Sequence, residues 1–456
     1  MDSHIIQALK DIVGTDRLET AAEELQCYSY DGTGQEFVPA AVAFPASTEQ
    51  ISKIMELATA EQFPVVPRGA GSGMTGGSLP VAGGLVLALG RMDRILEIDE
   101  ENQLAIVEPG VITGKLRETL APLGLFYPPD PASLKFCTLG GNVAECAGGP
   151  SAVKYGVTRD YVLGLEVVLA DGRILETGVR TRKGVVGYDL TRLFTGSEGT
   201  LGVITKIILR LTSRPTASKT FLLLFAEMVQ AATLVADMLK EHAPSTLEYL
   251  DHTALSLVAD KLPFDLPAKT KAMLLVELDG DAQSVKLQNS RLNDFLAGRP
   301  DILLQQQAET PEEVDNLWMA RRSVSPAAFN LRPDKISEDV VVPRSKIPDL
   351  VACAAELGSR YQLPIFTFGH AGDGNIHVNI MVDKANQAEV DRAQQAKEAL
   401  FRHVLDLQGS LSGEHGIGLT KAPFLDLELS ETSLDIQQQL KNLFDPLHIL
   451  NPGKIF

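Results

Sequence analysis

Two histidines flank a glycine-rich turn in the last quarter of the chain. Residues 366–381 read FTFGHAGDGNIHVNIM, which is an apolar run, a turn of Ala, Gly, Asp and Asn, and a second apolar run. This pattern predicts a β-hairpin that brings His370 and His377 to one end of a sheet. A second glycine-flanked turn, SGEHGIG, contains Glu414 and His415. Two imidazoles and a carboxylate are a common ligand set for a catalytic metal with open coordination positions. One such histidine alone could be purely structural, but three of eight gather in these two turns, which favours a shared site.

A glycine-rich loop lies near the start of the chain. Residues 66–78 read VPRGAGSGMTGGS, between an apolar run at 63–66 and the run GGLVLALG at 83–90, so we expect a loop between two strands. Dense glycines let the backbone approach a ligand, and successive N–H groups form a concave anion site. The loop is not a Walker A motif, because no Gly-Lys-Ser/Thr closes it, and Leu79-Pro80 stops any following helix. A flexible surface linker is disfavoured by the two apolar runs.

Further glycine clusters follow. Residues 128–149 read PPDPASLKFCTLGGNVAECAGG, in which three prolines within four residues predict a stiff entry and GGN opens a short helix at 142–146. KYG at 154–156 and FTGSEGTLG at 194–202 complete the set, and the latter turns into a strand at 203–209. Taken alone, the second cluster could be an ordinary turn before a buried helix. Together with the first loop, it favours a shared ligand.

These segments resemble, in sequence and in order, the PCMH-type FAD-binding domain of flavoproteins related to vanillyl-alcohol oxidase. The matching motifs are PRGAGSGMTGGS, PDP, GGN, KYG and TGSEGTLG, and they cover residues 36–214 closely. The resemblance implies FAD. Ser72 stands where covalent members often carry a flavin-linking histidine, which implies that the FAD is not covalently bound. LNPGK, which contains Asn451, matches a C-terminal motif that folds back onto the flavin domain. The residues that the resemblance places along the FAD are Pro67, Arg68, Gly69, Ala70, Gly71, Ser72, Gly73, Thr75, Gly76, Gly77, Ser78, Pro129, Ser133, Thr138, Gly140, Gly141, Asn142, Ala147, Gly148, Tyr155, Glu198, Gly199, Gly202, Val203, Ile204 and Asn451.

GHxGDGNxH followed by GEHG resembles the signature of one branch of these flavoproteins, the D-2-hydroxyacid dehydrogenases. That branch includes FAD-linked D-lactate dehydrogenases, D-2-hydroxyglutarate dehydrogenases and the flavin subunit of glycolate oxidase. The resemblance implies that His370, His377 and Glu414 bind a divalent metal, commonly zinc, with manganese as the alternative. It also implies that His415 is the catalytic base.

The carboxylate of such a substrate needs a cation. Arg321 follows Trp318 at the interval that the family shows, in the Arg-rich part of an expected helix. Arg322, one position along, is the alternative candidate for this cation. The alternative without a function is that Arg321 simply lies on a solvated face of the helix. A guanidinium pairs bidentately with a carboxylate, which suits this role. Three further residues are expected to help bind the substrate: Ser325, Lys335 and His370.

The implied reaction is the oxidation of a D-2-hydroxy acid, with D-lactate or glycolate foremost, to the 2-oxo acid by hydride transfer to flavin N5. D-2-hydroxyglutarate or another D-2-hydroxy acid is the alternative substrate. One alternative class is a non-catalytic electron-transfer subunit, against which the intact His370, His377, Glu414 and His415 argue. The other is a non-catalytic FAD-binding regulator, for which the sequence offers no positive signal. The sequence leaves the electron acceptor open between an iron–sulfur subunit, an electron-transferring flavoprotein, a quinone and a cytochrome.

Composition narrows the class of protein. The net charge of −18, from 41 basic and 59 acidic residues, argues against nucleic-acid binding. No window approaches the apolar length of a membrane span. The four cysteines form no CxxC pair and suit a reducing compartment. We therefore expect a cytoplasmic protein, with peripheral association at the inner face of the membrane as the alternative. Whether it forms a homodimer stays open.

The expected fold is α+β, with a two-subdomain flavin domain, an antiparallel-sheet cap domain with helices on one face, and a C-terminal segment that returns to the flavin. Alternating apolar strands and amphipathic helices on both sides of Arg214 support this organisation. The expected parts are a helical lead-in at 1–35, the flavin domain at 36–214, the cap domain at 215–420 and the C-terminal segment at 421–456.

Overall fold

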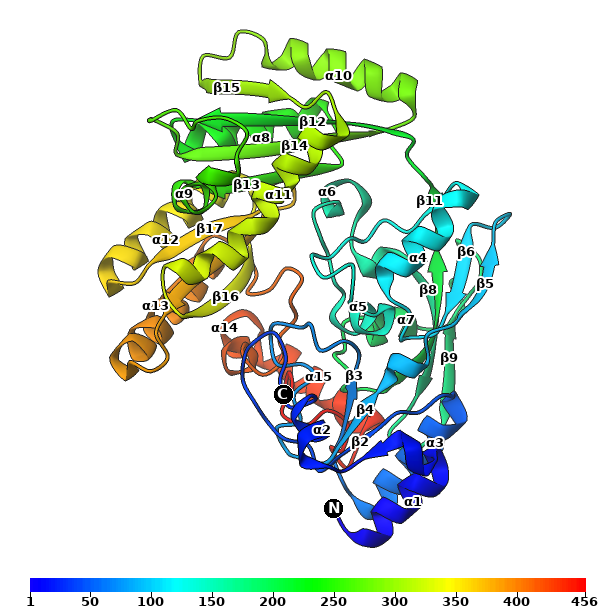
Figure 1. Ribbon diagram of the computed structural model, residues 1–456. Coiled ribbons are helices and arrows are strands. Elements are labelled where there is room, and N and C mark those ends of the chain that lie inside the picture. Colours follow the sequence, from blue (N-terminus) through cyan, green and yellow to red (C-terminus); the bar gives the residue numbers. More distant parts are fainter. The chain divides into compact units, whose positions relative to one another are not determined.

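The computed structural model describes residues 1–456, the whole chain. Its first compact unit contains residues 1–148, 157–214 and 414–456, and its second contains 149–156 and 215–413 (Figure 1). The units therefore change over after Arg214 and after Gly413, where the sequence analysis expected changes after residues 214 and 420. Residues 1–35 form no separate lead-in, because a strand within them joins a sheet of the first unit.

A four-stranded sheet organises the N-terminal part of the first unit. Its order is β1 (Leu18–Glu19), β2 (Ala41–Ala43), β4 (Leu85–Ala88) and β3 (Val65–Arg68), and the last three are parallel. Helices α1 (Ser3–Val13) and α3 (Thr48–Glu61) bury Leu9, Ile51 and Met55 in one core with residues of these strands. Ser47 caps α3 by accepting the N–H of Gln50. Parallel β3 and β4 enclose the glycine-rich loop.

A second sheet of the first unit has five antiparallel strands. Its order is β5 (Ile95–Asp99), β6 (Leu104–Val107), β10 (Val203–Arg210), β8 (Val162–Val168) and β9 (Ile174–Gly178). The short strands β7 (Leu125–Phe126) and β11 (Thr212–Ser213) pair with each other. The helices of this region are α2 (Ala22–Gln26), α4 (Thr113–Leu120), α5 (Leu139–Glu145) and α7 (Leu190–Phe194).

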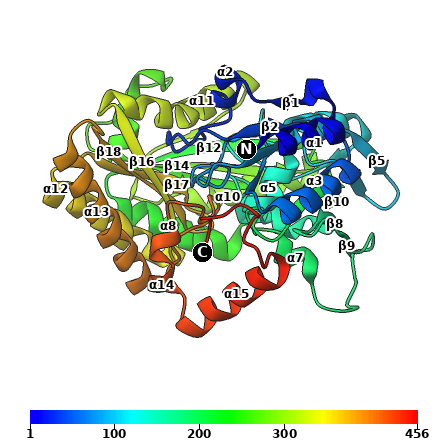
Figure 2. The same ribbon diagram turned by 90° about the horizontal axis from the view of Figure 1, so that it is seen from below.

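The C-terminal segment belongs to the first unit and packs on its sheets. It contains α14 (Leu425–Glu428) and α15 (Glu431–Phe444), and α15 lies beside α7 (Figure 2). The rings of Phe194 and Phe444 meet edge to face at 5.3 Å between centroids. Farther on, Leu450 forms a parallel bridge with Val65 of β3. The segment thus completes the layer that holds the glycine-rich loop.

The second unit is built on one antiparallel sheet of seven strands. Its order is β15 (Ile302–Gln307), β12 (Ala217–Phe225), β14 (Ala272–Gly280), β13 (Thr246–Asp251), β17 (Ile365–His370), β18 (Asn375–Val382) and β16 (Asp334–Val341). The predicted hairpin is present as β17 and β18, in which Phe368 lies opposite His377.

Helices cover both faces of this sheet, so the expectation of helices on one face was wrong. The reason lies in the alternation along β18, where Met381 faces a core that contains Leu317 of α11, while Ile380 and Val382 face a core that contains Ala393 of α13. The helices are α9 (His252–Leu257) and α11 (Pro311–Ala327) on the first face, α12 (Ile347–Tyr361) and α13 (Gln387–Asp406) on the second, and α6 (Ala152–Tyr155), α8 (Met228–Glu241) and α10 (Ala282–Leu296) elsewhere in the unit.

The strand register gathers polar side chains on the α11 face. His377 lies opposite Asp339, and Glu248 lies opposite His370. These residues keep the parity of Phe368 and Met381, which pack against α11. The α11 face of the sheet therefore gathers these four polar side chains. No helix is both long and apolar enough to cross a membrane.

Candidate active site

A cavity in the first unit is built around the glycine-rich loop. Its walls come from residues 67–78, from the start of α5 and from the turn that precedes β10, and both Glu414 and His415 line it. The predicted flavin residues that line this cavity are Pro67, Arg68, Gly69, Ala70, Gly71, Ser72, Gly73, Gly77, Ser78, Ser133, Thr138, Gly140, Gly141, Asn142, Ala147, Gly148, Glu198, Gly199, Gly202 and Ile204. Those that lie outside its lining are Thr75, Gly76, Pro129, Tyr155, Val203 and Asn451.

The glycines of the loop allow close packing that a side chain would block. A Cβ on Gly69 would meet the Thr138 hydroxyl at 2.3 Å, and one on Gly77 would meet Glu145 at 2.6 Å. Gly71 has φ +65°, a left-handed conformation that a side chain rarely adopts. A wall made of glycine backbone suits an anionic pyrophosphate, which backbone N–H groups bind at short range. The residues present therefore fit an FAD.

Glu198 ties the turn that carries His415 to the cavity wall. Its two carboxylate oxygens accept the backbone N–H groups of Ile417 and Gly418, each at 2.7 Å. The Thr75 hydroxyl donates to the His415 carbonyl at 3.1 Å, which secures the turn from the loop side. Complete burial raises the pKa of Glu198 to about 6, although the two backbone hydrogen bonds act to lower it. The backbone around His415 is thus fixed from two sides.

The C-terminal segment supports the loop from outside the cavity. The Asn451 side chain donates to the carbonyls of Gly77 and Glu198, both at 2.7 Å. Lys454 donates to the Leu79 carbonyl at 2.7 Å, and its burial lowers its pKa to about 8. Asn451 therefore acts on the predicted flavin residues through their backbone, from a position behind the cavity lining.

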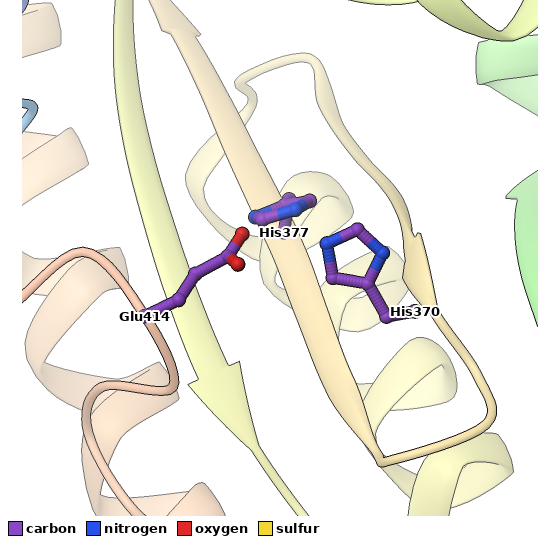
Figure 3. A group of neighbouring side chains, drawn as sticks. All are labelled: His370, His377 and Glu414. Atoms are coloured by element: carbon purple, nitrogen blue, oxygen red, sulfur yellow. The ribbon is translucent and has the colours of Figure 1, made fainter. Parts of the chain in front are cut away.

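In the second unit, the hairpin brings His370 and His377 together. Both are buried, at 5% and 8% exposure, and their ring centroids lie 5.1 Å apart. The second unit ends at Gly413, and Glu414 is the next residue of the chain. Possible ligand atoms of His370, His377 and Glu414 all lie within 4.8 Å of one another (Figure 3). Two imidazoles and a carboxylate at this spacing fit a divalent transition metal such as zinc or manganese.

A buried carboxylate on β13 contacts both His370 and Arg321. Glu248 Oε2 accepts from Arg321 Nε at 2.7 Å and lies 2.5 Å from its Nη2, while Oε1 pairs with His370 Nδ1. The Arg321 guanidinium also stacks over Phe368, 4.5 Å from the ring centroid. Burial by itself would raise the pKa of Glu248, but His370 and Arg321 lower it overall. Arg322, the alternative candidate, is exposed.

The chain just before Glu414 is fixed by Asp339 of β16. This fully buried carboxylate accepts the Gly413 N–H at 2.8 Å and the Ser412 hydroxyl at 3.2 Å. The backbone at Ser410 also bridges to Val341 at the end of the same strand. These bonds hold the segment that leads into Glu414 on the sheet.

The remaining predicted residues lie within the second unit. Lys335 donates to the Ser325 hydroxyl at 2.6 Å, and burial lowers the Lys335 pKa. Tyr155, expected along the flavin, donates its hydroxyl to Asp279 at 2.7 Å, and Lys154 contacts the same carboxylate. KYG thus contacts Asp279 of β14 in this unit.

Sequence reasoning missed three acidic residues of these two sites: Glu145, Glu248 and Asp339. Glu145 lies in the interval between GGN and KYG and lines the cavity. Glu248 lies in β13 and Asp339 lies in β16, and a carboxylate within a strand was the one available signal. A charged residue inside a buried strand requires a partner, and that rule could have marked both for attention.

Most of the chain matches two known protein families. Residues 39–178 match the FAD binding domain family, and residues 214–455 match the family of FAD linked oxidases, C-terminal domain. The glycolate oxidase subunit GlcD of Bacillus subtilis (strain 168) is 44% identical over 452 residues, which cover 99% of this chain and 96% of that protein. The D-lactate dehydrogenase of Anaerostipes hadrus is 33% identical over 436 residues, which cover 91% of this chain and 89% of that protein.

The fold has counterparts among solved structures. The crystal structure of p-cresol methylhydroxylase with substrate bound superposes with a TM-score of 0.82 at 18% identity, over 99% of this chain and 96% of that one. At this identity the likeness concerns the fold alone, and it confirms the predicted α+β, PCMH-type architecture. The family matches confirm the predicted FAD-binding domain. The chain therefore belongs to the family of FAD-linked oxidases.

Proposed function

We propose that the protein is an FAD-dependent dehydrogenase that oxidises a D-2-hydroxy acid to the 2-oxo acid, with D-lactate and glycolate as the foremost substrates. The observation that carries this proposal is the set of polar residues on the α11 face of the seven-stranded sheet. There, Arg321 and the buried His370 share the carboxylate of Glu248, and the ring of the buried His377 lies beside that of His370. The names of the two relatives described above support the same substrate class.

Arg321 is proposed to bind the substrate carboxylate. Glu248 occupies its Nε and Nη2 groups, which leaves the Nη1 donors for a ligand. The side chain is only 12% exposed and is held over the Phe368 ring, so its fork is already oriented. Lys335, held by Ser325, is proposed to assist as a second cation. The exposed Arg322 lacks such a setting.

His370, His377 and Glu414 are the residues that would hold a divalent metal, zinc in the first place and manganese as the alternative. A metal in that site would polarise the substrate oxygens and lower the pKa of the hydroxyl. FAD, when bound in the cavity of the first unit, would supply the acceptor for the C2 hydride. The protein's own part is to bind, orient and exclude water.

His415 is proposed to accept the hydroxyl proton. It lines the flavin cavity, and its backbone is fixed by Thr75 and by the Glu198 clamp on the following residues. An imidazole in a rigid turn can act as a general base without a costly reorganisation. Glu414 and His415 are neighbours in sequence, yet the proposal assigns the first to the metal and the second to the proton.

The electrons must leave toward a partner that the chain does not contain. The relative from Bacillus subtilis is named a subunit, which supports membership in a larger assembly. We propose that the acceptor is an iron–sulfur subunit, an electron-transferring flavoprotein, a quinone or a cytochrome. A cytoplasmic location, with peripheral association at the membrane, goes with this proposal.

The decisive experiment is anaerobic reduction of the purified flavoprotein by a panel of acids. The panel contains glycolate, D-lactate, L-lactate and D-2-hydroxyglutarate, and the readout is loss of the oxidised flavin absorbance. Rapid bleaching by a D-2-hydroxy acid, with slow or no bleaching by L-lactate, is the expected result. Bleaching by none of the acids, in protein with full FAD and metal content, would refute the proposed function.

A further inference from the structure

One carboxylate in the second unit serves two partners of different kinds. Glu248 has no exposed side-chain surface, and its two oxygens point to different groups. Oε2 accepts the Nε–H of Arg321 at 2.7 Å, with Nη2 at 2.5 Å, and Oε1 pairs with Nδ1 of His370. Both oxygens are therefore engaged, each by a residue to which the proposed function gives a separate task.

The strand register makes this double contact possible. Glu248 on β13 is the direct cross-strand partner of His370 on β17, so the carboxylate reaches the imidazole without a long side chain. Arg321 comes from α11 above the same face and is held from the other side by the ring of Phe368. The guanidinium is clamped between a carboxylate and an aromatic face, which restricts its rotamers.

The contact with His370 also selects one form of the imidazole. An ionised carboxylate only accepts hydrogen bonds, so Nδ1 must carry the hydrogen. In a neutral ring of this tautomer Nε2 carries the lone pair, which is the form that a metal ligand needs, and a carboxylate on the far nitrogen raises the basicity of that ligand atom. Arg321 balances the charge that this arrangement buries, since an unpaired carboxylate in such a place would be costly.

We propose that Glu248 is a positioning residue that orients the metal-binding histidine and the carboxylate-binding arginine at the same time. The proposal rests on the proposed function for the roles of His370 and Arg321. Glu248 touches neither substrate nor flavin in this account. Glu248 couples the metal-binding residue His370 to the carboxylate-binding residue Arg321, because any shift of its carboxylate moves both of these side chains.

The test replaces Glu248 by an isosteric amide, Glu248→Gln. A glutamine can accept from Arg321 through its oxygen, but its NH₂ group then faces Nδ1 of His370 and favours the tautomer with hydrogen on Nε2. The matched control is Glu277→Gln. Glu277 is a partly buried carboxylate on the same sheet, and it accepts from Trp318 of α11 at 3.1 Å and from Thr220 at 3.2 Å.

The first measurement is Zn²⁺ affinity of the purified, FAD-loaded protein by competition with a chelating dye. We expect Glu248→Gln to bind Zn²⁺ about 10–100-fold more weakly than wild type, the usual cost of losing such a supporting carboxylate, and Glu277→Gln to bind it as wild type does. The second is the KM for the best acid of the panel, which should rise in Glu248→Gln alone. FAD content and Tm are recorded for all three proteins.

The outcomes separate this inference from the proposed function. Equal Zn²⁺ affinity in wild type and Glu248→Gln overturns the inference, whatever the panel of acids shows. A parallel loss in Glu277→Gln would assign the effect to general damage of the sheet and overturn it as well. If no acid reduces the flavin but Glu248→Gln alone loses Zn²⁺ affinity, the proposed substrate class fails and the positioning of His370 stands.

Discussion

Glu198 and Gly418 are 220 residues apart in the sequence, yet the Glu198 carboxylate accepts the Gly418 backbone N–H at 2.7 Å. The same carboxylate accepts the N–H of Ile417. Glu198 belongs to a motif expected along the flavin, and Gly418 closes the turn that carries His415. A residue of the cavity wall thus holds the proposed base in place through backbone bonds alone.

This contact predicts a specific pH dependence of stability. Because burial raises the pKa of Glu198 from its ordinary value of 4.5 to about 6 in the folded protein, the folded state holds the proton more tightly than the unfolded chain. The contribution of this group to stability is fully present below about pH 4.5 and is lost as the pH rises through about 6. We expect the free energy of unfolding of wild type, relative to Glu198→Gln, to fall across that window in urea titrations. A difference that stays constant with pH would contradict the raised pKa.

Denatured protein should release its flavin. Ser72 lies in the cavity lining, at the position that the sequence resemblance aligns with the flavin-linking histidine often found in covalent members, and a serine offers no imidazole for a flavin bond. Acid precipitation of the yellow protein should leave free FAD in the supernatant, as measured by its absorbance and chromatography. Flavin that remains with the precipitated polypeptide would show a covalent link at another residue.

Arg321→Lys should weaken substrate binding far more than FAD binding. Lysine keeps the charge but loses the planar fork, and with it the simultaneous contact to Glu248 and the substrate. We expect a loss of about 2–3 kcal/mol in substrate binding, the size of a charged hydrogen bond. The measurement is KM and the flavin content of Arg321→Lys beside Arg322→Lys. Damage confined to Arg322→Lys would show that the alternative candidate is the correct one.

Mutations should distinguish the residues that bind the metal from the residue that accepts the proton. Replacing His370, His377 or Glu414 by Ala should release the metal, because each supplies one ligand of the group. His415→Asn should keep metal and FAD but slow flavin reduction by roughly 10²–10⁴-fold, the usual effect of a general base. Elemental analysis beside stopped-flow reduction of all four variants checks both statements. Loss of metal in His415→Asn with retention in Glu414→Ala would reverse the two roles, and full reduction rates in chelator-stripped wild type would remove the metal from the reaction.

The hairpin and the glycine-rich loop could be predicted because each depends on a short, local sequence pattern. The hairpin of β17 and β18 follows from an AGDGN turn between apolar runs, and the loop after β3 follows from glycines between parallel strands. Strands that the sequence did not reveal include β5, β8, β9 and β15, and for β5 and β15 the reason is their place in the sheet. Both are edge strands that expose one side, and β15 ends in three glutamines, so the apolar signal of a strand is weak there.

Long-range register explains what stayed hidden. The contact of Glu248 with His370 spans 122 residues and depends on the pairing of β13 with β17, which no local pattern specifies. The placement of α11 on one face of the sheet, and of α12 and α13 on the other, likewise depends on how its strands pair. A carboxylate buried within a strand requires a hydrogen-bonding or charged partner, but only the folded chain identifies that partner.

The first unit is assembled from three stretches of chain, and its last stretch, residues 414–456, pairs Leu450 with Val65 of the edge strand β3. During synthesis, the second unit, which ends at residue 413, can complete its sheet while the flavin unit still waits for its closing piece on the ribosome. The nascent flavin unit must therefore persist with an open sheet edge until translation has passed residue 450. The wall of the predicted flavin cavity, which Asn451 supports through Gly77 and Glu198, is therefore complete only after this last stretch has been synthesised.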